Sequence, residues 1–204
     1  MLSIIIPSFN EPNIKNMICE CQQLFPTARI IVGNDISGRG KGYATMEGVK
    51  HELRFIPWLS EDIIVFIDGD GDIEPRMIKR LLPFLDDYGI VVGKKCLRGF
   101  PLRRKIITTL SRIYIRLMFG LTIDTQTGIK AFRAGTIPWW ESEKFLFDVE
   151  ILVKAKRTGV RILEVPVDIT AISKTKSLGV LWIALVDSLK IWYRLFVPSA
   201  KTKI

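Results

Sequence analysis

Apolar residues along the chain form two kinds of run, one short and continuous and the other longer with helical spacing. The short runs predict strands at residues 2–6, 29–32, 63–67, 90–92, 128–132 and 160–167, and the run at 63–67 predicts a strand that is buried on both faces. The periodic runs predict amphipathic helices, at residues 14–24, 46–56, 75–82, 102–119, 147–157 and 178–197. Because strand and helix alternate at least three times, we expect an α/β fold with a mostly parallel sheet.

The strand predicted at 63–67 ends in Asp68-Gly69-Asp70-Gly71-Asp72, which holds three carboxylates separated only by glycine. Ligands of open α/β sheets bind at the edge where the carboxyl ends of the strands lie. Carboxylates this close repel one another unless a cation lies between them. Oxygen ligands suit Mg²⁺ or Mn²⁺, and such an ion in turn suits a diphosphate. The segment therefore predicts a metal–diphosphate site, with a solvated acidic turn as the simpler alternative.

Other polar turns are expected at the same edge of the sheet. The segments 7–11 and 34–35 close the first two predicted strands, so their side chains should face the crevice that holds Asp68. They could contact a nucleobase and a ribose, or serve only as polar turns. Gly40-Lys41-Gly42 enters a helix and could bring a lysine and backbone N–H groups close to a phosphate.

Composition and charge exclude several classes of protein. An EF-hand needs glycine at its sixth position and glutamate at its twelfth, and here these are Ile73 and Lys79. His51 is the only histidine, which argues against a histidine-based zinc site and a Ser-His-Asp triad. The three cysteines form no CxxC pair, so we expect reduced thiols in the cytosol.

The net charge of +9 calls for an anionic partner, and the basic residues gather at 94–116 and in the last thirty residues, among large apolar side chains. No helix-turn-helix, zinc-finger or RRM pattern is visible, so nucleic acid is the weaker interpretation. A basic amphipathic helix on an anionic membrane fits better, and no apolar run reaches the ~18 residues of a membrane span.

Taken in order, these motifs resemble those of family 2 inverting glycosyltransferases with a GT-A fold. Residues 124–133 (DTQTGIKAFR), 147–152 (FDVEIL) and 164–167 (EVPV) are similar to segments of polyprenyl-phosphate and dolichyl-phosphate hexose synthases, which include glucosyltransferases and mannose synthases. The resemblance implies a Rossmann-like three-layer sandwich as the catalytic domain over residues 1–175. Residues 176–204 would form a C-terminal amphipathic helix, either part of that domain or associated with the membrane.

The resemblance also implies roles for individual residues. The implied catalytic residues are Asp68, Asp70 and Glu150, and the implied ligands of Mg²⁺ or Mn²⁺ are Asp70 and Asp72. The nucleotide sugar would be bound by Pro7, Phe9, Asn10, Glu11, Asp35, Lys41 and Asp68. The acceptor phosphate would be bound by Arg98, Arg103, Arg104, Lys130 and Lys176.

The implied reaction moves a hexose from UDP-glucose or GDP-mannose onto polyprenyl phosphate, at the cytoplasmic face of a membrane to which the protein binds peripherally. A lipid phosphate is already ionised near neutral pH, because its second pKa is about 6, so the acceptor needs cations more than a base. We therefore expect Glu150 to orient the acceptor or to pair with an arginine. Open alternatives are a transferase with a hydroxyl acceptor and a catalytically degenerate membrane-binding or nucleic-acid-binding relative.

Two departures from the family pattern concern the donor and acceptor sites. The segment 34–42 is short, so a strand that usually follows residue 38 is missing, and the late Gly-x-Ser-Lys segment is reduced to residues 173–176.

Two long helices carry the features expected of a membrane-facing surface. Lys105, Arg112 and Arg116 share one face of the helix predicted at 102–119 and could receive an anionic head group. An apolar seam lies next to this face, formed by Ile106, Leu110, Ile113 and Leu117. The aromatic residues of the last helix are either interfacial anchors or contacts in a core or a homodimer: Trp182, Trp192 and Tyr193.

Overall fold

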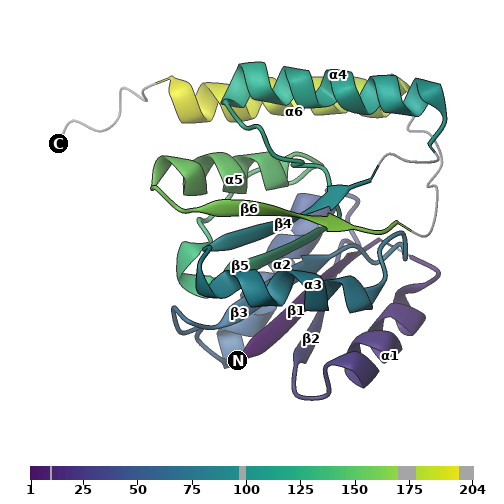
Figure 1. Cartoon of the computed structure of the whole chain (residues 1–204), viewed down its shortest axis with the longest axis vertical. Coiled ribbons are helices and arrows are strands. Elements are labelled where there is room, and N and C mark those ends of the chain that lie inside the picture. The colour runs from purple at the N-terminus through teal and green to yellow at the C-terminus, as the bar shows by residue number, and fades with distance from the viewer. Residues whose placement is uncertain (10, 97–99, 170–177, 198–204) are drawn as a thin grey trace.

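The computed structural model describes residues 1–9, 11–96, 100–169 and 178–197 (Figure 1). Six strands form one sheet in the order β2-β1-β3-β5-β4-β6. The strands are β1 (Leu2–Ser8), β2 (Arg29–Asn34), β3 (Ile63–Ile67), β4 (Ile90–Lys95), β5 (Ile129–Arg133) and β6 (Ile162–Val167). All six lie where the apolar runs predict strands, so the expected α/β fold is confirmed.

The sheet is mostly parallel, and β5 is the exception. β1 runs parallel to β2 and β3, and β4 runs parallel to β6, whereas β5 is antiparallel to both β3 and β4. Antiparallel neighbours need no crossover helix packed on the sheet. The helix between β4 and β5, α4 (Leu102–Phe119), is therefore free to lie farther out.

Helices cover both faces of the sheet and produce three layers (Figure 1). One core cluster contains residues of α1 (Ile14–Leu24) and α3 (Ile78–Leu81), and the other contains residues of α2 (Lys41–Phe55) and α5 (Phe147–Arg157). The alternation of side chains along the strands explains this division, because Ile4 and Ile6 belong to one cluster and Ile5 to the other. β3 is thus buried from both sides, as its continuous apolar run predicts.

Two helix predictions need correction. The helix expected at 46–56 begins at Lys41, because the glycine-rich segment before it supplies its first turn instead of a loop. The helix expected at 75–82 is divided into a 3₁₀ turn at Pro75–Met77, the short α3, and a second 3₁₀ turn at Leu82–Asp86. Pro83 lies in that second turn and lacks the N–H that a continuing α-helix requires.

α4 and α6 (Leu178–Phe196) lie side by side in an outer layer beside α5 (Figure 1). The Tyr114 Oη and Ser188 Oγ atoms are 2.7 Å apart, and the rings of Phe119 and Phe196 are in contact. Ile115 of α4 and Ile191 of α6 are buried in the core. The contacts explain why each helix buries only one narrow stripe of side chains.

Twelve large apolar side chains of these two helices are exposed, and we refer to them together as the α4–α6 surface. On α4 they are Leu102, Ile106, Leu110, Ile113 and Leu117. On α6 they are Trp182, Ile183, Leu185, Leu189, Trp192, Tyr193 and Phe196. Trp182, Trp192 and Tyr193 are all exposed, so of the roles expected for them a place in the core is wrong.

Candidate active site

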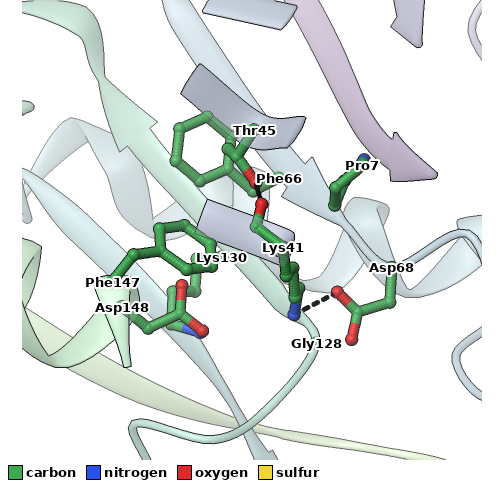
Figure 2. A pocket seen from close by; sticks show the side chains of 9 residues that line it. All are labelled: Pro7, Lys41, Thr45, Phe66, Asp68, Gly128, Lys130, Phe147 and Asp148. Atoms are coloured by element: carbon green, nitrogen blue, oxygen red, sulfur yellow. Dashed lines mark hydrogen bonds and ion pairs between the residues drawn. The ribbon is translucent and has the colours of Figure 1, made fainter. Parts of the chain in front are cut away.

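A narrow pocket lies where the carboxyl ends of β1 and β3 meet, next to the start of α2 and of α5 (Figure 2). Its lining residues are Pro7, Lys41, Thr45, Phe66, Asp68, Gly128, Lys130, Phe147 and Asp148. β1 and β3 are adjacent and parallel, so the segments that follow them reach the same edge. The expectation that motifs far apart in sequence would share one crevice is therefore confirmed for Pro7, Lys41 and Asp68.

Two ion pairs lie inside this pocket. Lys41 Nζ is 2.5 Å from Asp68 Oδ1, and Lys130 Nζ is 2.9 Å from Asp148 Oδ2. Burial lowers the pKa of Lys41, but the charges of Asp68 and Asp148 outweigh burial and raise that pKa above its ordinary value. Lys41 is thus a permanent cation in the pocket. It can stay on Asp68 or turn to an anionic ligand.

An acidic cluster borders the pocket, formed by Glu11, Asp68, Asp70 and Asp72. Burial and the charge of Asp68 raise the pKa of Asp70, although the Asp72 amide and Lys41 oppose the shift. Burial and the charges of Asp70, Asp68 and Asp72 raise the pKa of Glu11 in the same way. Mutual repulsion is therefore a property of the folded protein, and a cation bound among these carboxylates would relieve it.

The donor set at this cluster limits the kind of metal site it could form. The Asp72 amide donates to Asp70 Oδ1 at 3.1 Å, so the two residues form one turn. Within the described part of the chain, no group of three or more Asp, Glu, His or Cys side chains is placed to hold a metal ion. Mg²⁺ is commonly bound by one or two carboxylates together with water and substrate phosphates. Asp70 and Asp72 fit a divalent ion of that kind, but not a cage made by protein alone.

The other residues predicted to bind the donor are placed differently. Phe9 is exposed, Glu11 belongs to the acidic cluster, and Asn10 lies outside the described residues. Asp35 is buried, and its carboxylate accepts hydrogen bonds from the Gly40 amide at 2.6 Å, the Arg39 amide at 2.9 Å and the Ser37 hydroxyl at 3.2 Å. Although burial opposes them, these hydrogen bonds lower the pKa of Asp35. Asp35 thus organises the turn that leads to Lys41.

The amides of Gly42 and Tyr43 at the start of α2 are already bonded to the protein, contrary to the expectation that backbone N–H groups of this segment bind a phosphate. The Gly42 and Tyr43 amides donate to the carbonyl oxygens of Lys144 and Glu143, at 3.1 and 3.0 Å. A side chain at Gly42 would not fit, because its Cβ would lie 2.3 Å from a backbone oxygen of the same loop. Of the three residues 40–42, Lys41 lines the pocket with its side chain, as Figure 2 shows.

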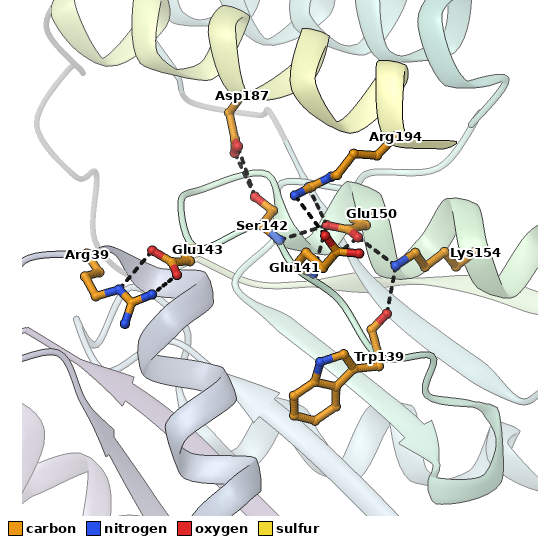
Figure 3. Close-up of polar contacts among 9 residues, drawn as sticks. All are labelled: Arg39, Trp139, Glu141, Ser142, Glu143, Glu150, Lys154, Asp187 and Arg194. Carbon is orange, nitrogen blue, oxygen red and sulfur yellow. Dashed lines mark hydrogen bonds and ion pairs between the residues drawn. The ribbon is translucent and has the colours of Figure 1, made fainter. Parts of the chain in front are cut away.

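Glu150, expected to act in catalysis, does not line the pocket. It is buried, and its carboxylate accepts hydrogen bonds from the amides of Glu141 and Ser142 (Figure 3). It also forms ion pairs with Lys154 at 2.7 Å and with Arg194 of α6 at 3.0 Å. Of the two roles expected for Glu150, pairing with an arginine is the one that the structure shows.

The carboxylate of α5 that faces the pocket is Asp148, which the sequence analysis did not predict as a site residue. Asp148 and Glu150 are two residues apart on a helix, so they point to different sides. The FDVEIL motif contained both, but the sequence offered no way to decide which side the sheet would occupy. Gly128, in the DTQTG segment, also lines the pocket without having been predicted as a site residue. Its backbone lies so close to the Asp68 carboxylate that no side chain would fit there.

The cations expected to bind the acceptor are only partly described. Lys130 is buried, and besides Asp148 it donates to the carbonyl oxygen of Thr127 at 2.7 Å. Arg103 is exposed on α4. Arg98 and Lys176, together with the side chain of Arg104, lie outside the described residues. Arg112, expected on a face that receives an anionic head group, is instead paired with Asp124 at 2.5 Å.

The fold is that of GT-A glycosyltransferases, which confirms the predicted fold. The chain superposes over its full length on glucosyl-3-phosphoglycerate synthase from Mycobacterium tuberculosis in complex with Mn²⁺ and UDP-glucose, with a TM-score of 0.69, 18% identity and 82% of that chain covered. A structure of the same enzyme with Mg²⁺ and UDP gives a TM-score of 0.70, also at 18% identity and 82% coverage of that chain.

The proteins that are similar to this chain in sequence include transferases named for polyprenyl and dolichyl phosphates. The chain is 32% identical to undecaprenyl-phosphate mannosyltransferase of Micrococcus luteus over 117 residues, which is 52% of this chain and 48% of that protein. It is 24% identical to polyprenol monophosphomannose synthase of Mycolicibacterium smegmatis, covering 82% of this chain and 66% of that protein.

A third relative is dolichyl-phosphate beta-glucosyltransferase of Dictyostelium discoideum, at 26% identity over 85% of this chain and 56% of that protein. The chain thus spans about half to two thirds of the length of these relatives. No protein-family model matches it. The predicted resemblance to polyprenyl-phosphate and dolichyl-phosphate hexose synthases is confirmed by these glycosyltransferases.

Proposed function

We propose that this protein is a metal-dependent inverting glycosyltransferase that moves a hexose from UDP-glucose or GDP-mannose onto polyprenyl phosphate. The α4–α6 surface is the observation that carries this proposal, because a polar nucleotide sugar gives no reason for twelve exposed apolar side chains on two neighbouring helices. The acidic pocket supplies the donor side, and the relatives named above act on polyprenyl and dolichyl phosphates.

On the donor side, Asp70 and Asp72 would hold Mg²⁺ or Mn²⁺ against the diphosphate of the nucleotide sugar. A bound divalent ion neutralises the charge that develops on the leaving diphosphate. Asp68 and Lys41 stand as a pair beside it, so the Lys41 ammonium can turn to a phosphate oxygen when the donor enters. Glu11 adds a fourth carboxylate to this cluster and strengthens its preference for a cation.

On the acceptor side, the proposed nucleophile is an oxygen of the lipid phosphate. That oxygen forms a bond to the anomeric carbon while the bond from this carbon to the nucleoside diphosphate breaks, and the configuration inverts. No protein base is required, because the phosphate is already ionised. The structure agrees with this reaction, since Asp148 is paired with Lys130 and Glu150 is fully engaged elsewhere.

The α4–α6 surface would bring the protein to its lipid. Arg103 and Arg116 of α4 and Lys190 of α6 are exposed among the apolar side chains, which suits an anionic membrane. Among the described residues, no helix is both long and apolar enough to cross a bilayer. We propose peripheral binding at the cytoplasmic face, where exposed thiols such as those of Cys19 and Cys96 stay reduced.

The decisive experiment offers the purified chain radiolabelled UDP-glucose or GDP-mannose, Mn²⁺ and polyprenyl phosphate in vesicles. We expect label to appear in a lipid product that mild acid hydrolyses, since glycosyl phosphates are labile. An acid-stable product would move the assignment to a hydroxyl acceptor. Binding of nucleoside diphosphate without transfer from any donor would leave a degenerate relative that only binds. A thermal-shift screen of both donors, with and without Mn²⁺, identifies the donor.

Membrane binding has its own test, in which Leu117→Ser is compared with Leu59→Ser. Both leucines are exposed, at 81% and 70%, but only Leu117 belongs to the α4–α6 surface. We expect Leu117→Ser to lower binding to anionic vesicles roughly tenfold, as the loss of one buried leucine predicts, while Leu59→Ser has no effect. A change from dimer to monomer with vesicle binding intact would instead assign the surface to a second copy of the chain.

A further inference from the structure

The loop 124–128 is the last part of the connection from α4 to β5, and it contacts both α4 and the candidate donor pocket. Its sequence, DTQTG, matched the family pattern, yet most of its residues do not line the pocket. The contacts at its two ends indicate what it does.

At the first end, the loop is bound to α4. Asp124 is 3% exposed, and its Oδ2 accepts hydrogen bonds from Arg112 Nη2 at 2.5 Å and from the Lys95 amide at 3.2 Å. Gln126 Nε2 donates to Ser111 Oγ at 2.6 Å. Two consecutive residues of α4 are therefore held by one turn of the loop.

At the other end, the loop forms the wall of the pocket. The carbonyl oxygen of Gly128 accepts a hydrogen bond from the Asp68 amide at 2.8 Å. A Cβ atom at Gly128 would lie 2.3 Å from Asp68 Oδ2, so the loop backbone rests directly on this carboxylate. The Thr127 carbonyl oxygen accepts from Lys130 Nζ. A displacement of the loop would consequently move Asp68 and Lys130.

The contact between Arg112 and Asp124 is a specific one. The charges of Lys95 and Arg112 lower the pKa of Asp124 although burial opposes them, so Asp124 is ionised at neutral pH. Arg112 Nε is buried and has no hydrogen-bond partner among the described residues. The guanidinium has thus lost hydration at that atom, and its bond to Asp124 offsets part of the loss. A cation that served only as an outward head-group ligand would have stayed in solvent.

We propose that the Arg112–Asp124 ion pair is a positioning contact, which holds α4 and its lipid-facing surface in register with Asp68 in the donor pocket. This inference rests on the proposed function, because a phosphate presented beside α4 must meet the anomeric carbon of a donor held at Asp68. Misplacement of reacting groups by about 1 Å can cost a hundredfold in rate. A rigid connection between the two halves of the site is therefore needed, and the loop provides it.

The test compares Arg112→Leu with Arg161→Leu, which changes an exposed arginine immediately before β6 and outside the α4–α6 surface. For Arg112→Leu we expect the KM for polyprenyl phosphate in vesicles to rise roughly tenfold, as loss of a charged hydrogen bond predicts, with the Kd for UDP and Mn²⁺ unchanged. Arg112→Lys should recover part of the loss because it keeps the charge. Arg161→Leu should leave both constants as they are.

Hydrogen exchange provides a readout that needs no lipid and no turnover. In Arg112→Leu, amides of the loop and of Asp68 should exchange roughly tenfold faster, whereas Arg161→Leu should not change them. A wild-type protein that transfers nothing to polyprenyl phosphate would refute the proposed function, and the exchange data would still decide whether the pair positions the loop. Unchanged exchange and unchanged acceptor KM in Arg112→Leu would overturn the positioning role. Should that variant fail to fold, Arg112→Lys and Asp124→Asn carry the same comparison.

Discussion

Two acidic regions of this molecule differ in how their charge is balanced. In the cluster at the end of β3, carboxylates are close to one another, and their repulsion contributes to the raised pKa values of Glu11 and Asp70. Around Glu150, two cations and two backbone amides surround a single buried carboxylate. The first arrangement costs stability and favours a cationic ligand, and the second stabilises the fold. The difference teaches that net electrostatic balance, more than the presence of acidic residues, separates a ligand site from a structural contact.

The balanced region connects three parts of the chain (Figure 3). Arg194 links α6 to Glu150 of α5, and Asp187 of α6 accepts hydrogen bonds from the Ser142 hydroxyl at 2.9 and 3.1 Å. The α4–α6 layer is therefore attached to the body of the domain through buried polar contacts as well as through Ile115 and Ile191.

Glu150→Ala should produce the largest effect on stability. The substitution leaves Lys154 and Arg194 without their buried partner and two amides without an acceptor, so we expect a loss of about 3–5 kcal/mol in the free energy of unfolding. Denaturant unfolding followed by circular dichroism measures this value. A loss of transfer activity with unchanged stability would instead return Glu150 to the catalytic machinery.

Asp70→Asn should have the opposite effect, because the variant should fold normally and lose transfer activity. We expect transfer to fall about 10²–10³-fold, similar to the loss of one group that stabilises developing charge in other enzymes. The control is Asp87→Asn, an exposed aspartate after the second 3₁₀ turn. Initial rates at saturating donor and Mn²⁺ give the comparison, and near-normal turnover by Asp70→Asn would remove this residue from the proposed metal site.

The pH dependence of stability should distinguish the two regions further. Because the pKa of Asp70 is raised in the folded protein, its contribution becomes unfavourable as pH rises from the ordinary carboxylate pKa of about 3.9 through the raised value. Asp70→Asn should therefore raise the Tm at pH 7, and this gain should vanish as pH falls below the ordinary value. Calorimetry from pH 3.5 to 7.5 tests the sign. If Asp70→Asn were less stable than wild type at pH 7, the negative charge of Asp70 would be stabilising in the folded protein, contrary to this prediction.

The smallest effect on the free energy of unfolding is expected at an ion pair whose two charges neutralise each other but are exposed to solvent. Arg39 and Glu143 form a two-pronged contact between the turn before α2 and the loop before α5, with side chains 47% and 35% exposed. Glu143→Gln should change the free energy of unfolding by about 0–1 kcal/mol, since water screens such pairs. The measurement is the same denaturant titration used for Glu150→Ala. A loss comparable to that of Glu150→Ala would mean that burial is not what separates the two pairs.

The sequence by itself determined the order and the type of the elements. Continuous apolar runs located all six strands, and helical spacing located α4 and α5 to the residue, because these patterns reflect local geometry and burial. It also placed Asp68 at the sheet edge and identified the GT-A resemblance. Each of these conclusions depends on residues that are neighbours in the chain or belong to one motif.

Only the tertiary structure decided which side chains meet. The choice between Asp148 and Glu150 depends on which side of α5 faces the pocket, and the partner of Arg112 depends on a loop twelve residues away. The exposure of the apolar seam of α4 depends on β5 running antiparallel, which leaves α4 outside the sheet layers. Side-chain direction and long-range pairing are set by packing, and amphipathic spacing alone does not distinguish a buried stripe from one that faces a membrane.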